Sequence, residues 1–314
     1  MSSGPRSRNN SYAQFFFGNP KFYCNEVTGE SKNVEMVFRF KGNIMRLTIK
    51  VVIFLSSVGA QAAGPQIEEP EGLLQRIRTK MVAQLSQLPN YTCHQVVDRW
   101  ARTARSGSLN YQDQLEFEVA FIGNKELYGR PGEARIEEAS VTSIVRTGTI
   151  GNGAFGSSAY AIFFGEEAEF TYIGESKKYR QMTFRYDFKV PQEKSHFLLK
   201  RNSKQGFVAY EGSFWVNAET LDLVRLELKA EADQIPPHLG VRFAMESMHY
   251  TKMRIRDTEF LLPVDSEIAA EDELGTYSLN MIRLERCQEF TGQSVVTFGG
   301  AVEGGSADRQ GPNP

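Results

Sequence analysis

Past residue 91 the chain alternates apolar and polar positions with a period of two residues. The clearest run is RQMTFRYDF at 180–188, and shorter runs lie at 115–121, 224–229, 241–245 and 253–256. Such alternation is typical of strands with one packed and one wet face, which favours an antiparallel sheet. Short polar connections at 203–206 and 256–258 suit hairpins. The pattern therefore predicts a long up-and-down meander.

A different period precedes this sheet. Within residues 71–88 apolar side chains recur at spacings of three and four, so they share one helix face: Leu73, Leu74, Ile77, Met81, Leu85 and Leu88. The Pro89-Asn90 pair ends the helix. An amphipathic helix buries its apolar stripe against another element, and the sheet that follows is the candidate. Together the two patterns predict an α+β fold.

The segment 133–165 breaks the strand rhythm. Residues 133–146 could form a helix, with Ile136, Val141, Ile144 and Val145 on one side. A glycine-rich loop follows at 148–156, and residues 157–164 fit either a second short helix or a strand. We expect this insert to cover the sheet or its open edge.

Residues 45–63 have the three-part layout of a secretory signal peptide. Arg46 and Lys50 form the positive region, residues 51–58 the apolar run, and residues 60–62 a small-x-small cleavage site. One alternative is a membrane anchor, for which the apolar run is short. A buried core strand is the other. We expect a periplasmic or secreted protein that is cleaved near Ala62.

The export signal divides the chain. Residues 1–44 are interpreted as a mis-called or disordered extension, with Met36 or Met45 as the true start, and a genuine long n-region is the alternative. Residues 45–62 are the signal peptide and residues 63–298 a single β-rich domain. Residues 299–314 form a Gly- and Pro-rich tail that we expect to be disordered.

Removing residues 1–62 discards Cys24 and leaves Cys93 and Cys287. Two cysteines in an oxidising compartment predict one disulfide, which would tie the first strand of the domain to one of the last. Two unrelated buried thiols are the alternative. Closing so long a loop would contribute a few kcal/mol, mainly by restricting the unfolded chain.

Charge and motifs argue against several partners. Residues 63–314 carry 28 basic and 35 acidic groups, so the body is acidic and unlike a nucleic-acid surface. GNGAFG at 151–156 matches the GxGxxG dinucleotide pattern, but no βαβ unit surrounds it, so a plain loop is the better interpretation. We expect no nucleic-acid partner, no nucleotide and no cofactor.

Metal and nucleophile signatures are missing from the sequence as well. No pair has the spacing of metal ligands among the histidines of the body: His94, His196, His238 and His249. There is no GxSxG motif. A Ser/His/Asp triad whose members are far apart in the sequence and meet in the folded chain remains an alternative. The carboxylates at 166–169 are interpreted as solvated surface.

The most distinctive segment is EGSFWVNAETLDLVRLEL at 211–228, which reads as strand, turn and strand. A plain hairpin with Trp215 packed at its edge explains it, and Trp215 in a ligand-facing groove is the functional alternative. With the helix at 71–88, this form resembles the LolA/LolB-like periplasmic lipoprotein carriers, in which a helix precedes a long antiparallel meander. LPNYTC at 88–93 and the hairpin also resemble a group of uncharacterised secreted proteins.

The resemblance to the carriers covers architecture, and no carrier signature maps residue by residue. It implies a half-barrel: a curved sheet whose concave face is apolar and is capped by the N-terminal helix and the helical insert. Such a face can hold an acyl chain, since each buried CH₂ contributes about 0.8 kcal/mol. The candidates for it are Met182, Phe184, Tyr186, Phe188, Trp215, Leu226, Leu228, Phe243 and Met245. A sealed core under the helix is the alternative role for them.

Three functions follow from this interpretation. The first is an exported binding protein that holds a lipid, a lipoprotein or another apolar ligand in the curved sheet. The second is a structural or protein-interaction domain of the cell envelope with a packed core. The third is an extracytoplasmic hydrolase, which requires convergent histidine, serine or carboxylate groups in a cleft.

Overall fold

The computed structural model describes residues 13–17, 69–104, 107–123, 125–132, 141–145, 147–152 and 156–290. The predicted signal peptide at 45–62, the tail at 299–314 and residues 133–140 of the insert lie outside these ranges. Ten of the strands form one large sheet: β2 (Tyr91–Arg102), β3 (Asn110–Ile122), β4 (Lys125–Gly129), β6 (Glu169–Ser176), β7 (Thr183–Val190), β10 (Tyr210–Asn217), β11 (Leu223–Glu231), β12 (Val241–Ile255), β13 (Thr258–Asp272) and β14 (Tyr277–Glu289).

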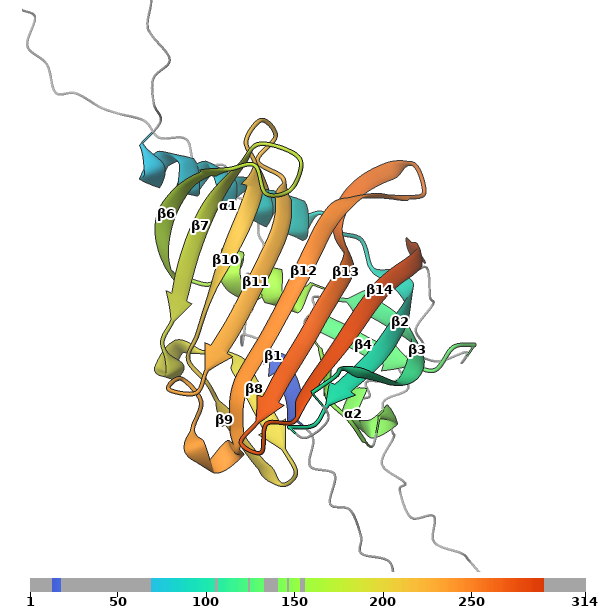
Figure 1. The fold of residues 1–314 in the computed structure, drawn as a ribbon. Helices are drawn as coiled ribbons and strands as arrows, with labels where there is room; N and C mark the ends of the chain where they lie inside the picture. Colours follow the sequence, from blue (N-terminus) through green and yellow to red (C-terminus); the bar gives the residue numbers. More distant parts are fainter. Residues whose placement is uncertain are drawn as a thin grey trace, which may run out of the picture.

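The large sheet is curved, and its order is β4-β3-β2-β14-β13-β12-β11-β10-β7-β6 (Figure 1). Every neighbouring pair is antiparallel, and β10 to β14 follow one another in sequence and in space, which confirms the predicted meander. β2 pairs with β14, so the first long strand of the domain extends the sheet beside the last one. The predicted Cys93–Cys287 disulfide is present and joins these two strands across 194 residues of sequence.

A second, four-stranded sheet has the order β5-β1-β8-β9. It consists of β1 (Ala13–Phe17), β5 (Ile150–Gly151), β8 (Phe197–Arg201) and β9 (Lys204–Phe207). β1 pairs in parallel with β5 and antiparallel with β8. Phe197 and Leu199 of β8 are buried in the hydrophobic core of the large sheet. The small sheet was not predicted, and β1 comes from the stretch that was interpreted as an extension.

The helices that cover the large sheet are α1 (Pro70–Ser86), α2 (Val141–Ile144) and α3 (Ser157–Phe164). α1 matches the predicted amphipathic helix, because it buries Leu73, Ile77, Met81 and Leu85. α3 is apolar on nearly all sides and lies against α1 and the sheet, so the stretch 157–164 is a buried helix and not a strand. Over the described ranges no helix is both long enough and apolar enough to cross a bilayer. The α+β prediction is confirmed.

α1 and α3 lie on the same side of the large sheet, behind the strands in the view of Figure 1. We call this side the helix-covered face and the opposite side the open face. Across the strands, Tyr186 pairs with Phe214 and Leu226 with Met248, and all four are buried in the core. Four of the predicted ligand-face residues belong to this helix-covered core, Tyr186, Phe188, Leu226 and Leu228, and Phe184 is partly buried and packs against it.

Phe243 and Met245 lie on the open face, so the prediction was wrong for them. The core positions of β12 are Ala244, Glu246 and Met248, and side chains one residue away point to the other side. In the segment VRFAMESM the odd-numbered and the even-numbered positions both contain apolar residues. The alternation therefore does not show which of the two sets faces the core.

Trp215 is also on the open face, where it pairs across the strands with Arg185 and Arg225. It is only 2% exposed because other open-face groups cover it. The ring of Tyr179 meets Trp215 edge-on at 5.4 Å, and the Lys178 amino group lies 5.0 Å from the indole centroid. β10 and β11 form the predicted hairpin, and Trp215 does not belong to the apolar core of the helix-covered face.

Met182 shares the parity of Phe184 but precedes the first residue of β7, and 37% of it is exposed. It therefore lies at the rim of the sheet, outside the packed interior to which the alternation had assigned it.

Candidate functional site

Glu246, in the middle of β12, is a carboxylic acid buried in the helix-covered core. Across the strands Glu246 pairs with Leu228 and with Ile268, both of which are fully buried. Glu246 itself is 2% exposed. Glutamate is almost never buried to this degree without a partner, because a carboxyl removed from water needs hydrogen bonds to replace those it loses.

The hydrogen bonds of Glu246 satisfy only one of its two oxygens. Ser158 of α3 donates its Oγ–H to Glu246 Oε2 at 2.8 Å. The other oxygen, Oε1, is buried and has no hydrogen-bond partner among the described residues. A buried oxygen that lacks a partner typically costs about 1–3 kcal/mol. Glu246 is therefore a feature that folding alone does not explain.

A second carboxylate holds the same end of α3. Glu126 of β4 accepts hydrogen bonds from the backbone N–H and the side chain of Ser157, at 3.1 and 2.8 Å. The hydroxyl of Tyr128 also donates to Glu126, at 2.9 Å. A carboxylate at a helix N-terminus is favourable because the first N–H groups have no partner within the helix. The strands β4 and β12, which are far apart in the sequence, thus hydrogen-bond to two consecutive serines at the start of α3.

The pKa of Glu246 is raised to about 8, mainly by burial and also by the nearby charge of Glu126, with the hydrogen bond from Ser158 acting in the opposite direction. Burial also raises the pKa of Tyr91, Tyr128 and Tyr250, which surround this part of the core. At neutral pH the Glu246 carboxyl therefore carries its proton and is uncharged.

A neutral carboxyl group is a hydrogen-bond donor and a poor base. Glu246 cannot take the proton of Ser158 at neutral pH, so this pair does not activate a serine nucleophile. The carboxyl instead has an O–H group of its own, which is free to donate from Oε1 while Oε2 accepts from Ser158. A carboxylic acid kept neutral by an apolar site is suited to bind a hydrogen-bond acceptor.

The groups around Glu246 are aromatic and aliphatic. From α3, Ala159, Ile162 and Phe163 are each at most 1% exposed. Phe163 meets Phe214 of the sheet edge-on at 5.2 Å, and Phe214 stacks on Tyr186 at 5.3 Å. The site is therefore a buried carboxyl group, hydrogen-bonded to Ser158, in a region where the sheet and α3 are packed with aromatic and aliphatic side chains.

Sequence reasoning missed Glu246, Glu126 and Ser158. Glu246 was assigned to a wet face because its neighbours Met245 and Phe243 were taken as core. The even-numbered positions of β12 offered a signal. Ala244, Met248 and Tyr250 are apolar, and Glu246 is the charged residue among them. No spacing in the sequence connects Glu126 or Ser158 to it.

The histidines do not join the site. His94 faces Glu116 and Glu118 on the neighbouring strand, and His249 faces Asp265. Among the described residues no group of three or more His, Cys, Asp or Glu side chains is arranged to hold a metal ion.

No family model matches the chain, and no curated protein matches it. Two solved structures are similar to it in architecture. The crystal structure of a DUF1329 family protein from Desulfovibrio piger is 12% identical with a TM-score of 0.39, covering 72% of this chain and 96% of that one. An outer membrane lipoprotein-sorting protein domain from Vibrio parahaemolyticus is 9% identical with a TM-score of 0.36, covering 70% and 93%.

Proposed function

We propose that this protein is an exported binding protein for a single apolar ligand, such as a lipid acyl chain, whose polar end accepts a hydrogen bond from Glu246. The observation that carries the proposal is the buried Oε1 of Glu246, which lacks a partner among the described residues inside an apolar interior. A ligand carbonyl, ester or carboxylate would supply the missing acceptor.

α3 is the element that such a ligand would displace. It has eight residues, and its buried side chains occupy the space between α1 and the sheet. Replacing one apolar occupant of a core by another exchanges similar contacts, so the net cost is small. The polar attachments of α3 are at Ser157 and Ser158, at Tyr160, whose hydroxyl donates to the carbonyl of Leu85 at 2.6 Å, and at Gly165, whose carbonyl accepts from Arg78 at 2.8 Å.

The end of α3 requires a glycine. A Cβ at Gly165 would lie 2.6 Å from the carbonyl oxygen of Ala161, a distance that real Cβ atoms do not reach. The chain therefore leaves the helix in an extended conformation at this point, with φ of −69° and ψ of 158°, before β6 begins.

Export supports the same interpretation. The Cys93–Cys287 disulfide is of a kind that persists in oxidising compartments such as the periplasm. Together with the signal peptide expected at 45–62, it favours a function outside the cytoplasm.

The test begins with the ligand. The full chain would be produced in a bacterial host, purified from the periplasm, extracted with organic solvent and analysed by mass spectrometry. The result we expect is about one acyl-containing molecule per protein, absent from an equally purified unrelated periplasmic protein. The delipidated protein should then bind palmitate saturably in calorimetric titration.

Two variants separate a ligand role of Glu246 from a structural one. Glu246→Gln keeps a donor at the same position and should bind palmitate within a few-fold of the original affinity. Glu246→Leu keeps the apolar volume and removes the donor, so binding should weaken about tenfold. Absence of both co-purified lipid and saturable palmitate binding would refute the proposal. Equal binding by both variants would remove Glu246 from the site.

A further inference from the structure

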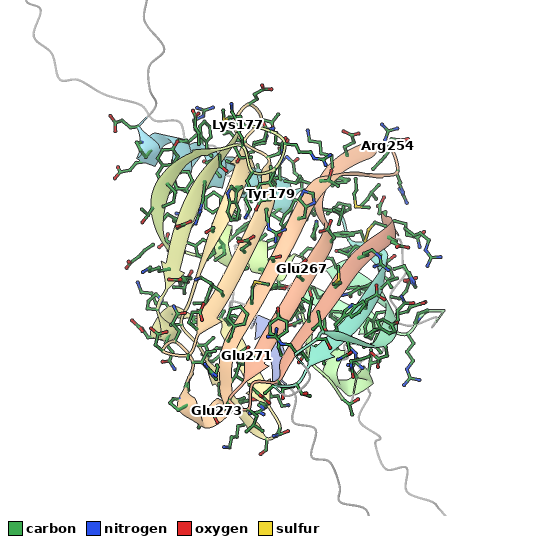
Figure 2. All side chains as sticks on the ribbon, in the orientation of Figure 1. Lys177, Tyr179, Arg254, Glu267, Glu271 and Glu273 are labelled. Atoms are coloured by element: carbon green, nitrogen blue, oxygen red, sulfur yellow. A yellow bond between two sulfur atoms is a disulfide. The ribbon has the colours of Figure 1, made fainter. Side chains whose placement is uncertain are left out.

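A pocket of about 370 Å³ lies at the other end of the molecule's sheets, between the ends of β2, β13 and β14 and the loop at 147–149. Arg201, the last residue of β8, closes one wall of it. Asp272 of this pocket lies between Glu271 and Glu273, which Figure 2 labels at the lower end of the sheet. The pocket shares no lining residue with the Glu246 site and is independent of the function proposed for that site.

The charges inside this pocket cancel in pairs. Arg99 donates from Nε and Nη2 to the two oxygens of Asp113, at 2.6 Å each. Arg201 donates from Nη2 to Asp272 at 3.0 Å. A bound anion would have to compete with a carboxylate already seated on each guanidinium, and a bound cation with the guanidinium on each carboxylate. The pairing therefore favours an uncharged ligand.

The walls of the pocket are fixed by further hydrogen bonds. The Arg99 guanidinium donates to the carbonyl of Thr147 at 2.5 Å, and buried Asn280 donates to the carbonyl of Thr149 at 2.8 Å. Gly148 has a φ of +91°, and a Cβ there would lie 2.2 Å from Arg99 Nη1. The positive φ favours glycine at this position, and the hydrogen bonds to Thr147 and Thr149 hold the loop in place without a ligand.

One polar group of the wall has no partner. Nε1 of Trp100 is buried and makes no hydrogen bond to any described residue. The indole ring belongs to the pocket lining and meets the ring of Tyr111 edge-on at 5.2 Å. The wall thus combines an aromatic surface with an N–H donor that awaits an acceptor.

We infer that this pocket binds a neutral, hydroxyl-rich ligand of one or two sugar rings. A sugar hydroxyl both donates and accepts, which suits a lining that contains Arg and Asn donors together with Asp and backbone-carbonyl acceptors. The apolar C–H face of a sugar ring packs on an aromatic side chain such as Trp100. A ring oxygen or hydroxyl gives the indole N–H its acceptor.

The chain has two tryptophans, Trp100 and Trp215, which makes the site directly observable. In the Trp215→Phe variant of the full chain, tryptophan emission reports on Trp100 alone. Titration with maltose, cellobiose and diacetylchitobiose should produce a saturable emission change with at least one of them. Sodium citrate at matched ionic strength should produce none.

A pocket-filling variant makes the test specific. Ala101 lines the pocket, and Ala101→Leu in the Trp215→Phe background should weaken saccharide binding about tenfold or more while the thermal midpoint stays within a few degrees. Glu246→Leu should leave saccharide binding unchanged, so a failure of the lipid proposal is distinguishable from a failure of this one. No saturable response to any of the three saccharides, saturation by citrate alone, or undiminished binding by Ala101→Leu would overturn the inference.

Discussion

The two faces of the large sheet place the same residue types in opposite environments. On the open face, carboxylates are common, and most lie beside an arginine or lysine: Asp187 beside Arg185, Glu227 beside Arg225 and Glu211 beside Lys229. Figure 2 shows this face covered by such polar side chains. On the helix-covered face, Glu246 has a single serine donor. The comparison teaches that solvent and partners, and not residue type, decide whether a carboxyl is charged.

The energies of the two faces differ in the same way. Ion pairs on the open face are partly exposed, so each contributes about 0–1 kcal/mol. Their additional effect is to cover Trp215, over which the Arg185 guanidinium lies at 5.3 Å. The helix-covered face gains its stability from apolar contacts, and there a single unsatisfied polar atom costs as much as several surface ion pairs contribute.

The largest effect is expected from truncating aromatic residues of opposite faces. Phe214 is fully buried between Tyr186 and Phe163, so Phe214→Ala should lower the free energy of unfolding by about 3–5 kcal/mol. Phe243→Ala on the open face should cost less than about 1 kcal/mol. Urea unfolding of the two variants measures both, and comparable losses would show that the face assignment of β12 is wrong.

The next test is removal of the disulfide that joins β2 to β14. Cys93 is buried in the core, and the disulfide to Cys287 closes a loop across 194 residues of sequence. Replacing both cysteines by serine should destabilise the protein by about 2–5 kcal/mol in denaturant titration. The double variant should not respond to reductant, whereas the unaltered chain should. A loss below about 1 kcal/mol would mean that the sheet holds β2 and β14 together without the bond.

The buried carboxyl predicts a pH dependence with a definite sign. Because its folded pKa of about 8 exceeds the ordinary value of 4.5, folded Glu246 keeps its proton in a window where the unfolded chain loses it. Stability from this group is complete below pH 4.5 and falls by about 1.4 kcal/mol per pH unit towards pH 8. The Glu246→Gln variant has no titrating group at this position and lacks this slope. In thermal unfolding, its gain in stability over the unaltered chain should therefore grow between pH 5 and pH 8. Parallel curves for the two proteins would contradict the assignment.

The smallest effect is expected on the open face. Arg225 donates to Glu227 at 2.5 Å and to Ser247 at 2.9 Å, with both charged side chains partly exposed. A double-mutant cycle of Arg225→Ala and Glu227→Ala should give a coupling below about 1 kcal/mol that shrinks at high salt. A coupling of several kcal/mol would mean that this face is far less accessible to water than its exposure indicates.

The sequence was sufficient for elements with one unambiguous pattern. The stripe of Leu73, Ile77, Met81 and Leu85 located α1, and the run at 180–188 gave the parity of Phe184, Tyr186 and Phe188. The two remaining cysteines predicted the disulfide. In each case a single physical requirement, burial of one face or oxidation of a thiol pair, acts on residues that are visible in a short window.

The candidate sites could not be predicted in this way. Glu246, Ser158 and Glu126 come from β12, α3 and β4, and only the pairing of strands far apart in sequence brings them together. β12 added a second difficulty, since its two faces are both partly apolar. The pocket of Trp100 and Arg201 likewise exists because the small sheet, which leaves no clear alternation in the sequence, packs on the end of the large one.

The place of β1 has a consequence for maturation. β1 consists of residues 13–17, lies between β5 and β8, and contacts α3. A chain that starts at residue 63 has no β1, so β8 acquires an open edge with a row of backbone groups that seek partners. At the same moment α3 loses one of its neighbours. Cleavage near Ala62 would therefore change the small sheet from four strands to separate parts, because β1 is the strand that joins β5 to β8 and β9.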